Sequence, residues 1–175
     1  MKKIFKSFLL AEVILLIFCV CGCNFKNKIQ TEKDNVKDIA VEIIECIENN
    51  KRNDLKVLFS FEAAETKDFD DGMDYIFDTY TGSCEKVDDC GTHIRDSFYS
   101  GKQAKVAFSY FDIITTDSEY VLYFEYFLKD EINNNQNKIE KMKLVQKSDI
   151  IDEYNYNYGE KYERLGIYNP DWDDE

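Results

Sequence analysis

Two carboxylic acids stand among the aromatic and β-branched residues of the second half of the chain, and they could carry proton-transfer chemistry. They are Asp112 and Glu125. A carboxyl group in apolar surroundings has a raised pKa, which prepares it to exchange a proton near neutral pH. Strand alternation places Tyr110 on the same face as Asp112. Tyr75, Tyr110 and Tyr123 could donate hydrogen bonds to a reacting group.

The same residues allow a plainer interpretation. An aspartate that points outward at a strand bend is commoner than a catalytic one. We therefore assign no catalytic residue, and Asp112, Glu125 and Tyr110 remain candidates only. The aromatic side chains expected to line a ligand pocket are Tyr75, Phe108, Tyr110 and Tyr123.

The chain has a single histidine, His93, three residues after Cys90. This spacing is compatible with half a zinc site or with a Cys/His nucleophile pair. Zinc needs three or four ligands, and only Cys84 lies near. We therefore predict no metal and no cofactor, and expect a buried strand cysteine beside an exposed histidine. A disulfide between Cys84 and Cys90 stays open.

The N-terminus has the outline of a secretory signal. Lys2, Lys3 and Lys6 precede an apolar run over residues 8–20 that is interrupted by Glu12. A membrane-spanning helix needs about 20 apolar residues, and a central carboxylate opposes its insertion. The pattern favours a cleaved signal peptide over residues 1–22, with an uncleaved anchor as the alternative.

The apolar run ends in VCGC, which resembles the lipobox of bacterial lipoproteins. Cys23 follows Gly22, and Val20 occupies the position three residues before it. The resemblance implies that Cys23 carries a diacylglycerol and attaches the chain to the cell membrane on its extracytoplasmic side. An ordinary secretory signal with incidental cysteines is the alternative.

The charge balance is strongly acidic. The chain has 22 Lys and Arg against 35 Asp and Glu, a formal net charge of −13. This composition excludes nucleic acid as a partner, because phosphate binding requires basic residues. It also argues against a protein lying flat on anionic lipid. Polar residues 23–35 are expected to form a tether, 36–170 a single domain, and 171–175 an acidic tail.

The first half of the domain has helical periodicity. An apolar stripe with spacings of three and four residues predicts a helix over 36–50. A shorter helix follows over 53–60, and 67–82 repeats the stripe before ending at Gly82.

The second half alternates with a period of two. Strands are expected over 83–94, 102–116, 119–130 and 138–148. Helices followed by antiparallel strands predict an α+β domain, with three N-terminal helices on one face of a curved sheet of about four strands.

The strand over 119–130 is apolar on both faces, so both need cover. One face should meet the helices. A second subunit, the C-terminal segment or solvent would meet the other, which leaves a homodimer open.

This order of elements resembles the cone-shaped fold of the nuclear-transport-factor-like, or ketosteroid-isomerase-like, superfamily. More narrowly, the chain resembles a family of uncharacterised Gram-positive lipoproteins. The segments that carry the likeness are IIECIENNKRNDLKVLFS (43–60), DYIFDTYTG (74–82), CGTHI (90–94), YFDIITTDSEYVLYFEYF (110–127) and EKYERLGIYNP (160–170).

The family resemblance implies no catalytic residue, and the superfamily includes isomerases, dehydratases and binding modules on one scaffold. We expect a non-enzymatic module that binds a small apolar ligand or a protein partner. The alternative is an isomerase-like or hydratase-like acid/base enzyme that uses a carboxylate in a cone-shaped pocket.

Overall fold

The computed structural model describes residues 28–150 and 164–169. The chain divides into two compact units, Met1–Asn35 and Val36–Glu175. In the first unit, residues 28–35 are helical. The expected signal peptide over 1–22, Cys23 and the acidic tail over 171–175 lie outside the described residues. Within the described ranges, no helix is both long and apolar enough to span a membrane.

The second unit begins with helical residues 36–48, which bury the stripe that the sequence predicted. Ala40, Ile43 and Ile44 are at most 2% exposed. The acidic residues between them, such as Glu42 and Glu45, face solvent. The burial of one face against the sheet stabilises this helix, because helical propensity alone contributes little in water.

Three shorter helices complete this layer: α2 (Arg52–Val57), α3 (Phe61–Ala64) and α4 (Phe69–Thr79). The described residues therefore hold four helical segments before the sheet, where three were expected. The additional one is the single turn α3, whose first turn is capped by Ser60: the Ser60 hydroxyl accepts a hydrogen bond from the Ala63 amide at 3.2 Å. A helix of four residues is too short to show helical periodicity in the sequence, so α3 was not predicted.

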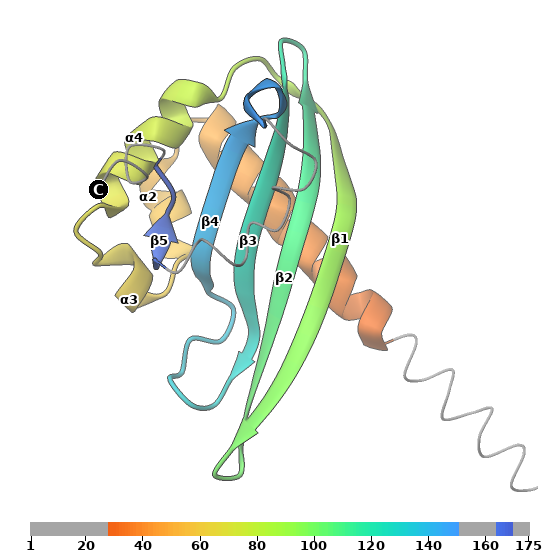
Figure 1. The fold of residues 1–175 in the computed structure, drawn as a ribbon, viewed down its shortest axis with the longest axis vertical. Helices are drawn as coiled ribbons and strands as arrows, with labels where there is room; N and C mark the ends of the chain where they lie inside the picture. Colours follow the sequence, from red (N-terminus) through yellow and green to blue (C-terminus); the bar gives the residue numbers. More distant parts are fainter. Residues whose placement is uncertain (1–27, 151–163, 170–175) are drawn as a thin grey trace, which may run out of the picture. The chain divides into compact units, whose positions relative to one another are not determined.

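The sheet has five strands in the order β1-β2-β3-β4-β5 (Figure 1). They are β1 (Cys84–Tyr99), β2 (Lys102–Thr115), β3 (Glu119–Asp130), β4 (Ile139–Gln146) and β5 (Gly166–Ile167). The first four are antiparallel, as predicted, and the two-residue β5 runs parallel to β4. The unit is therefore an α+β domain with helices followed by a mostly antiparallel sheet.

The short strand β5 docks on α4 through a glycine. A Cβ atom added at Gly72 would lie 2.3 Å from the carbonyl oxygen of Ile167. Both Gly72 and Ile167 are buried. The missing side chain thus lets a C-terminal segment lie directly against a helix backbone.

Strand alternation divides the sheet into two faces. On the face toward the helices, Phe111, Leu122 and Phe124 are fully buried. The rings of Phe111 and Phe124 stack with centroids 5.7 Å apart. The main core cluster draws on residues from Val36 to Ile167, so this unit contains its own core and we expect it to fold without the residues before it.

The turn between β3 and β4 is organised by the buried carboxylate of Asp130, which is 3% exposed. Its oxygens accept three backbone hydrogen bonds at 2.9–3.2 Å, from the amides of Ile132, Asn133 and Asn135. A carboxylate that accepts several amide protons is a strong local clamp. Asn134 and Asn137 in this turn have positive φ angles, a conformation that asparagine adopts more readily than most residues.

We predict that Asp130→Ala lowers the free energy of unfolding by about 2–4 kcal/mol, because it leaves three amides without an acceptor. Urea unfolding monitored by circular dichroism measures the loss. Asp117→Ala is the matched control, since Asp117 is an exposed turn residue between β2 and β3. A loss at Asp130 no larger than at Asp117 would contradict this role.

Candidate functional site

The second face of the sheet, opposite the core-facing side chains, collects most of the candidate residues. We call it the outer face and define it by Phe108, Tyr110, Asp112, Val121, Tyr123, Glu125, Lys141 and Lys143. The register places Phe108 beside Glu125, Tyr110 beside Tyr123, and Asp112 beside Val121. The prediction that Phe108, Tyr110 and Asp112 share a face is confirmed.

At its centre lies a buried group of three polar side chains. The Tyr123 hydroxyl donates a hydrogen bond to Glu125 Oε1 at 2.7 Å. The Lys141 ammonium lies 3.3 Å from the same oxygen. Tyr123 is 2% exposed and Glu125 is 7% exposed. The pKa of Tyr123 is raised because burial destabilises the charged phenolate, and because the hydrogen bond to Glu125 stabilises the neutral phenol.

Two tyrosine rings make the aromatic part of this face. The centroids of Tyr110 and Tyr123 are 4.8 Å apart, within the range of favourable ring contacts. Burial, and then the charge of Glu125, raise the pKa of Tyr110. Both phenols are therefore neutral at neutral pH, and the single hydroxyl proton of Tyr123 is donated to Glu125.

A second ion-pair group lies toward the other end of the outer face. The Lys147 ammonium contacts Asp112 Oδ2 at 2.9 Å and Glu119 Oε2 at 3.4 Å. The hydrogen bond with Asp112 is the main cause that raises the pKa of Lys147. Asp112 Oδ1 is buried and has no hydrogen-bond partner among the described residues. One oxygen of this carboxylate is thus engaged and the other is not.

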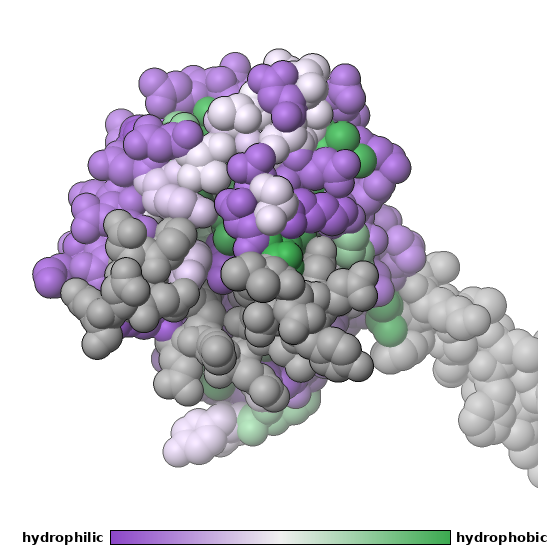
Figure 2. Space-filling model, turned by 45° about the horizontal axis from the view of Figure 1, so that its top comes forward, coloured by the Kyte–Doolittle hydropathy of each residue, from purple (hydrophilic) through white to green (hydrophobic). Residues whose placement is uncertain are grey.

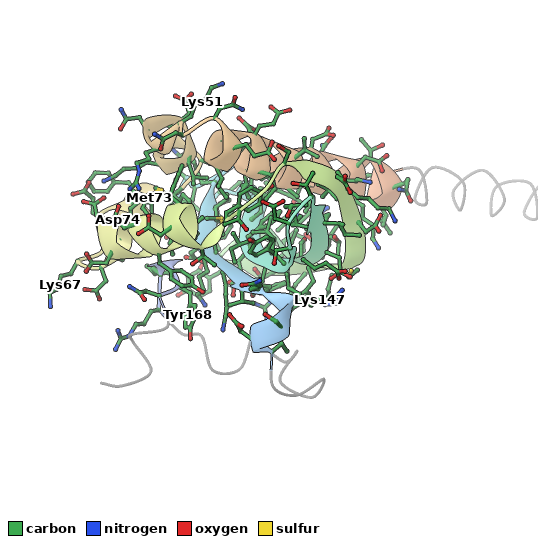
Figure 3. The ribbon with its side chains drawn as sticks, turned by 90° about the horizontal axis from the view of Figure 1, so that it is seen from above. Lys51, Lys67, Met73, Asp74, Lys147 and Tyr168 are labelled. Atoms are coloured by element: carbon green, nitrogen blue, oxygen red, sulfur yellow. The ribbon has the colours of Figure 1, made fainter. Side chains whose placement is uncertain are left out.

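Figure 3 places Lys147 and Tyr168 on the side of the sheet away from the helix over 36–48. The Lys143 ammonium lies 3.8 Å from the centroid of the Tyr168 ring, a cation–π contact. Tyr168 also donates its amide proton to the carbonyl of Met142 at 2.9 Å. The residue after β5 therefore extends the outer face beyond β4.

One predicted pocket residue lies apart from the others. Tyr75 belongs to α4, and its partly buried ring packs against the helix-side core. Burial is the main cause of its raised pKa, and the nearby charge of Asp149 adds to it. The sequence could not exclude Tyr75 from the pocket. Whether a residue on a helix lies beside residues on strands depends on tertiary packing, which leaves no local pattern in the sequence.

Sequence reasoning did not assign a role to Lys141 and Lys147. The signal was the alternation over 138–148, which places Lys141, Lys143 and Lys147 on the face opposite Met142 and Leu144. Both of the latter are fully buried in the core. Lys147 lies just past the end of β4, in the single 3-10 turn Lys147–Asp149. The partner of Lys141 depends on the pairing of β4 with β3, and the partner of Lys147 lies on β2.

The cysteine and histidine expectations have a mixed outcome. Cys90 is exposed, not buried as expected, because it lies on the edge strand β1 at an irregularity between Asp89 and Gly91. His93 is exposed, as expected. Although Cys90 is exposed, partial desolvation of its sulfur raises the pKa of the thiol, and the charge of Asp112 adds to this effect. A higher pKa leaves less thiolate at neutral pH, which opposes a role as nucleophile.

Cys46, Cys84 and Cys90 all have free thiols. Across the parts of the chain that the structure describes, no three His, Cys, Asp or Glu side chains lie close enough together to hold a metal ion.

A separate hollow of about 370 Å³ lies where the helix over 36–48 and α4 both end. Its lining includes Glu48, Asn49, Phe77, Tyr80 and Ser83. Glu48 Oε1 accepts hydrogen bonds from the Tyr80 hydroxyl at 3.0 Å and from the Cys84 amide. Burial and the Glu48 carboxylate raise the pKa of Tyr80. The hydrogen bonds of Glu48 in this polar hollow connect the helical layer to the start of β1.

The geometry can be compared with known families. A family model described as a domain of unknown function (DUF5104) matches residues 42–147. The chain belongs to the DUF5104 family. The matched DUF5104 region contains α2 to α4, β1 to β4 and the outer-face pairs of Glu125 and Asp112, whereas Cys23 and β5 lie outside it. A search of curated proteins finds no match.

The pairing of β3 with β4 in this DUF5104 domain contains an irregularity that partly buries a second glutamate, Glu140, near Glu125. The pairing slips between Glu125 and Tyr126, and Glu140 is the extra residue on β4. Burial, and then the charge of Glu125, raise the pKa of Glu140 above its ordinary value of 4.5. Between the unfolded and folded pKa values the folded chain binds more protons, so stability falls as pH rises through this window.

We therefore predict that Glu140→Gln raises Tm by about 1–3 °C at pH 7 and that the gain disappears below about pH 4. Differential scanning calorimetry across this pH range measures the effect. Glu85→Gln, at an exposed position of β1, controls for the change in net charge. A gain at Glu140 that is equal at both pH values would contradict the assignment.

Proposed function

We propose that this chain is a membrane-anchored extracytoplasmic lipoprotein whose DUF5104 domain is a non-enzymatic binding or interaction module. The anchor is supported by the basic residues at positions 2, 3 and 6, by the apolar run after them, and by Val20 and Gly22 ahead of Cys23. A stable attachment is expected, because two acyl chains hold a protein at a membrane where one binds reversibly.

We further propose that the domain has the cone-shaped fold of the nuclear-transport-factor-like superfamily and belongs with the uncharacterised Gram-positive lipoproteins that it resembles. Support comes from the order of elements, in which helices precede an antiparallel sheet. The cone in this proposal is filled: Phe111, Leu122 and Phe124 occupy the space between the helices and the sheet.

The observation that carries the binding-module proposal is the pairing of carboxylates with lysines on the outer face. Glu125 lies against Lys141, and Asp112 lies against Lys147. A general base needs free access to the proton that it removes, and a carboxylate held by an ammonium is a weaker base. The partly exposed Tyr110 ring, backed by the buried Tyr123 ring, instead offers apolar area beside fixed polar groups, which suits recognition.

The ligand that fits this surface is a small apolar or aromatic molecule, or an aromatic side chain of a protein partner. The partly exposed Tyr110 ring would supply contact area, and the Lys141 ammonium, held by Glu125, would orient a polar substituent. A second copy of the domain is a further partner that we propose for the outer face.

The alternative is an acid/base enzyme of the isomerase or hydratase type, and one observation favours it. Asp112 Oδ1 is buried without a hydrogen-bond partner among the described residues, so this oxygen could accept a substrate proton. Tyr110 would be the hydrogen-bond donor, because the Tyr123 hydroxyl already donates its proton to Glu125. Turnover of a carbonyl substrate that is lost in Asp112→Asn would establish the enzyme and overturn the binding module.

Native mass spectrometry of residues 24–175 tests the binding module. We expect excess mass that disappears on denaturation, or a partner-dependent complex, and we expect Tyr110→Ala to remove it. Val57→Ala is the control, because Val57 is an exposed apolar residue away from the outer face. A species of twice the chain mass would instead assign the outer face to a homodimer, and binding that Tyr110→Ala leaves unchanged would contradict the proposed site.

We predict that metabolic labelling with a radioactive fatty acid marks the wild-type chain and not the Cys23→Ala variant. The reason is that Cys23, directly after Gly22, occupies the position at which a lipobox cysteine is lipidated. Cys21→Ala is the matched control and should keep its label. Equal labelling of the Cys23 and Cys21 variants, or an unlabelled wild-type chain in the membrane fraction, would contradict lipidation at Cys23.

A further inference from the structure

Four large apolar side chains are exposed among the described residues, and they form two pairs. Val57 and Phe61 belong to α2 and α3, with 65% and 75% of their surface exposed. Phe98 and Tyr99 end β1, with 73% and 71% exposed. Single exposed apolar residues are ordinary on protein surfaces, so exposure alone carries no function. The pair at the end of β1 differs in its position and in the charges around it.

Phe98 and Tyr99 stand at the tip of a projecting hairpin. Tyr99 pairs with Lys102 across a two-residue turn. In this turn Ser100 has φ 51° and Gly101 has φ 81°. Positive φ at both central residues is the requirement of a type I′ turn, which matches the twist of the strands and holds the tip in one conformation.

The tip extends past the rest of the sheet. The last ladder pair between β2 and β3 is Ala104 with Asp130. Gln103 is still joined to the end of β3, because its carbonyl accepts a hydrogen bond from the Glu131 amide at 3.0 Å. The Tyr99–Lys102 pair and the turn therefore project by roughly 7 Å. A Cβ atom added at Gly101 would meet no other atom within 4 Å. In Figure 1 this hairpin is the lowest part of the sheet, below the turn between β3 and β4. The side chains of Phe98 and Tyr99 therefore reach open space first.

The hairpin is basic in an acidic chain. Lys102 is the basic residue at the tip, and Arg95 and Lys105 lie farther back along the hairpin. The Arg95 guanidinium stacks over the Phe108 ring at 4.6 Å. Asp96 is the one acidic residue between positions 95 and 105, and the Glu131 carboxylate, which accepts the Gln103 amide at 2.8 Å, lies beside the hairpin. Lys105 lies 3.7 Å from that Asp96 carboxylate, and Lys102 is exposed. The formal net charge of the whole chain is −13. The hairpin is thus a local exception to the acidic character of the protein.

The other exposed pair has charges of both signs around it. Phe61 is followed by Glu62 and Glu65, both exposed, while Lys56 precedes Val57 and the Lys138 ammonium donates to the Val57 carbonyl at 2.6 Å. An anionic surface would repel α3 and attract the β1–β2 hairpin. Figure 2, which views the unit from its upper side, shows mostly hydrophilic surface over the described residues away from the hairpin.

We propose that the β1–β2 hairpin tip, residues 98–102, inserts into the interface of a bilayer that contains anionic lipids. Phe98 would enter the acyl boundary, and the Tyr99 ring would lie at headgroup level with its hydroxyl in water. Lys102 would contact the lipid phosphates. A projection of roughly 7 Å falls within the depth of about 5–10 Å to which interfacial segments are buried.

This inference rests on the proposed membrane attachment and adds an orientation to it. The helix over 36–48 ends at Glu48, which bonds the Cys84 amide at the start of β1. Val36 lies about 18 Å back along this helix, nearer than Glu48 to the level of the hairpin tip. The chain thus enters the unit from the side that faces the tip. End-on contact also keeps the acidic body away from an anionic surface.

A membrane-tethered fluorescence experiment tests the inference without the lipid of Cys23. Residues 24–175 with an N-terminal hexahistidine are held on phosphatidylglycerol vesicles by a nickel-chelating lipid. Trp172, the single tryptophan, is replaced by Phe, and Tyr99→Trp supplies the probe. We expect brominated phosphatidylglycerol to quench this tryptophan by roughly half, with a blue shift, because interfacial aromatic residues reach the acyl chains.

Phe61→Trp in the same background is the matched control, because Phe61 and Phe98 are almost equally exposed. It should be quenched at most slightly. Lys102→Glu should reduce the quenching of the Tyr99→Trp probe, whereas Lys67→Glu, at an exposed lysine outside the hairpin (Figure 3), should not. Equal quenching at positions 61 and 99, or no quenching at 99, would overturn the inference. Because the histidine tag replaces the lipid, either result is independent of whether Cys23 is lipidated.

Discussion

The burial of β3 on both of its faces is the constraint on which the rest of the structure depends. Leu122 and Phe124 are buried against the helices, while Val121, Tyr123 and Glu125 are buried on the outer face. A strand in this position cannot slip by one residue, because a slip would exchange the two sets of side chains. The register of β3 therefore sets the positions of β2 and β4, and with them the neighbours of every outer-face residue.

Glu125 shows how this constraint produces a polar site inside an apolar strand. Its carboxylate is buried, so it needs partners, and the register supplies Lys141 from β4 and the Tyr123 hydroxyl from its own strand. The lysine stem covers apolar surface while its ammonium satisfies the charge. Buried ion pairs of this kind add little net stability, whereas the removal of one partner would leave an uncompensated buried charge.

The comparison of sequence with structure separates local from non-local information. The period of the apolar residues predicted the helix over 36–48, α4 and the four long strands, because burial on one face leaves a regular trace along the chain. It placed Tyr110 and Asp112 on one face correctly. The single turn α3 and the two-residue β5 left no such trace, since neither is long enough to repeat. The partners of Glu125 and Asp112 were also hidden, because they depend on pairing between strands that are distant in sequence.

The contact between Gly72 and Ile167 links two segments that are almost a hundred positions apart. A side chain at position 72 has no space unless β5 moves away from α4, and once β5 has moved, the cost of a larger residue at 72 disappears. Positions 72 and 167 are therefore structurally coupled, and a larger residue at position 72 is tolerated only after β5 has moved. Relatives that lack β5 are expected to have lost the glycine as well, so position 72 becomes a marker, readable from sequence alone, of whether a family member closes its sheet with a C-terminal strand.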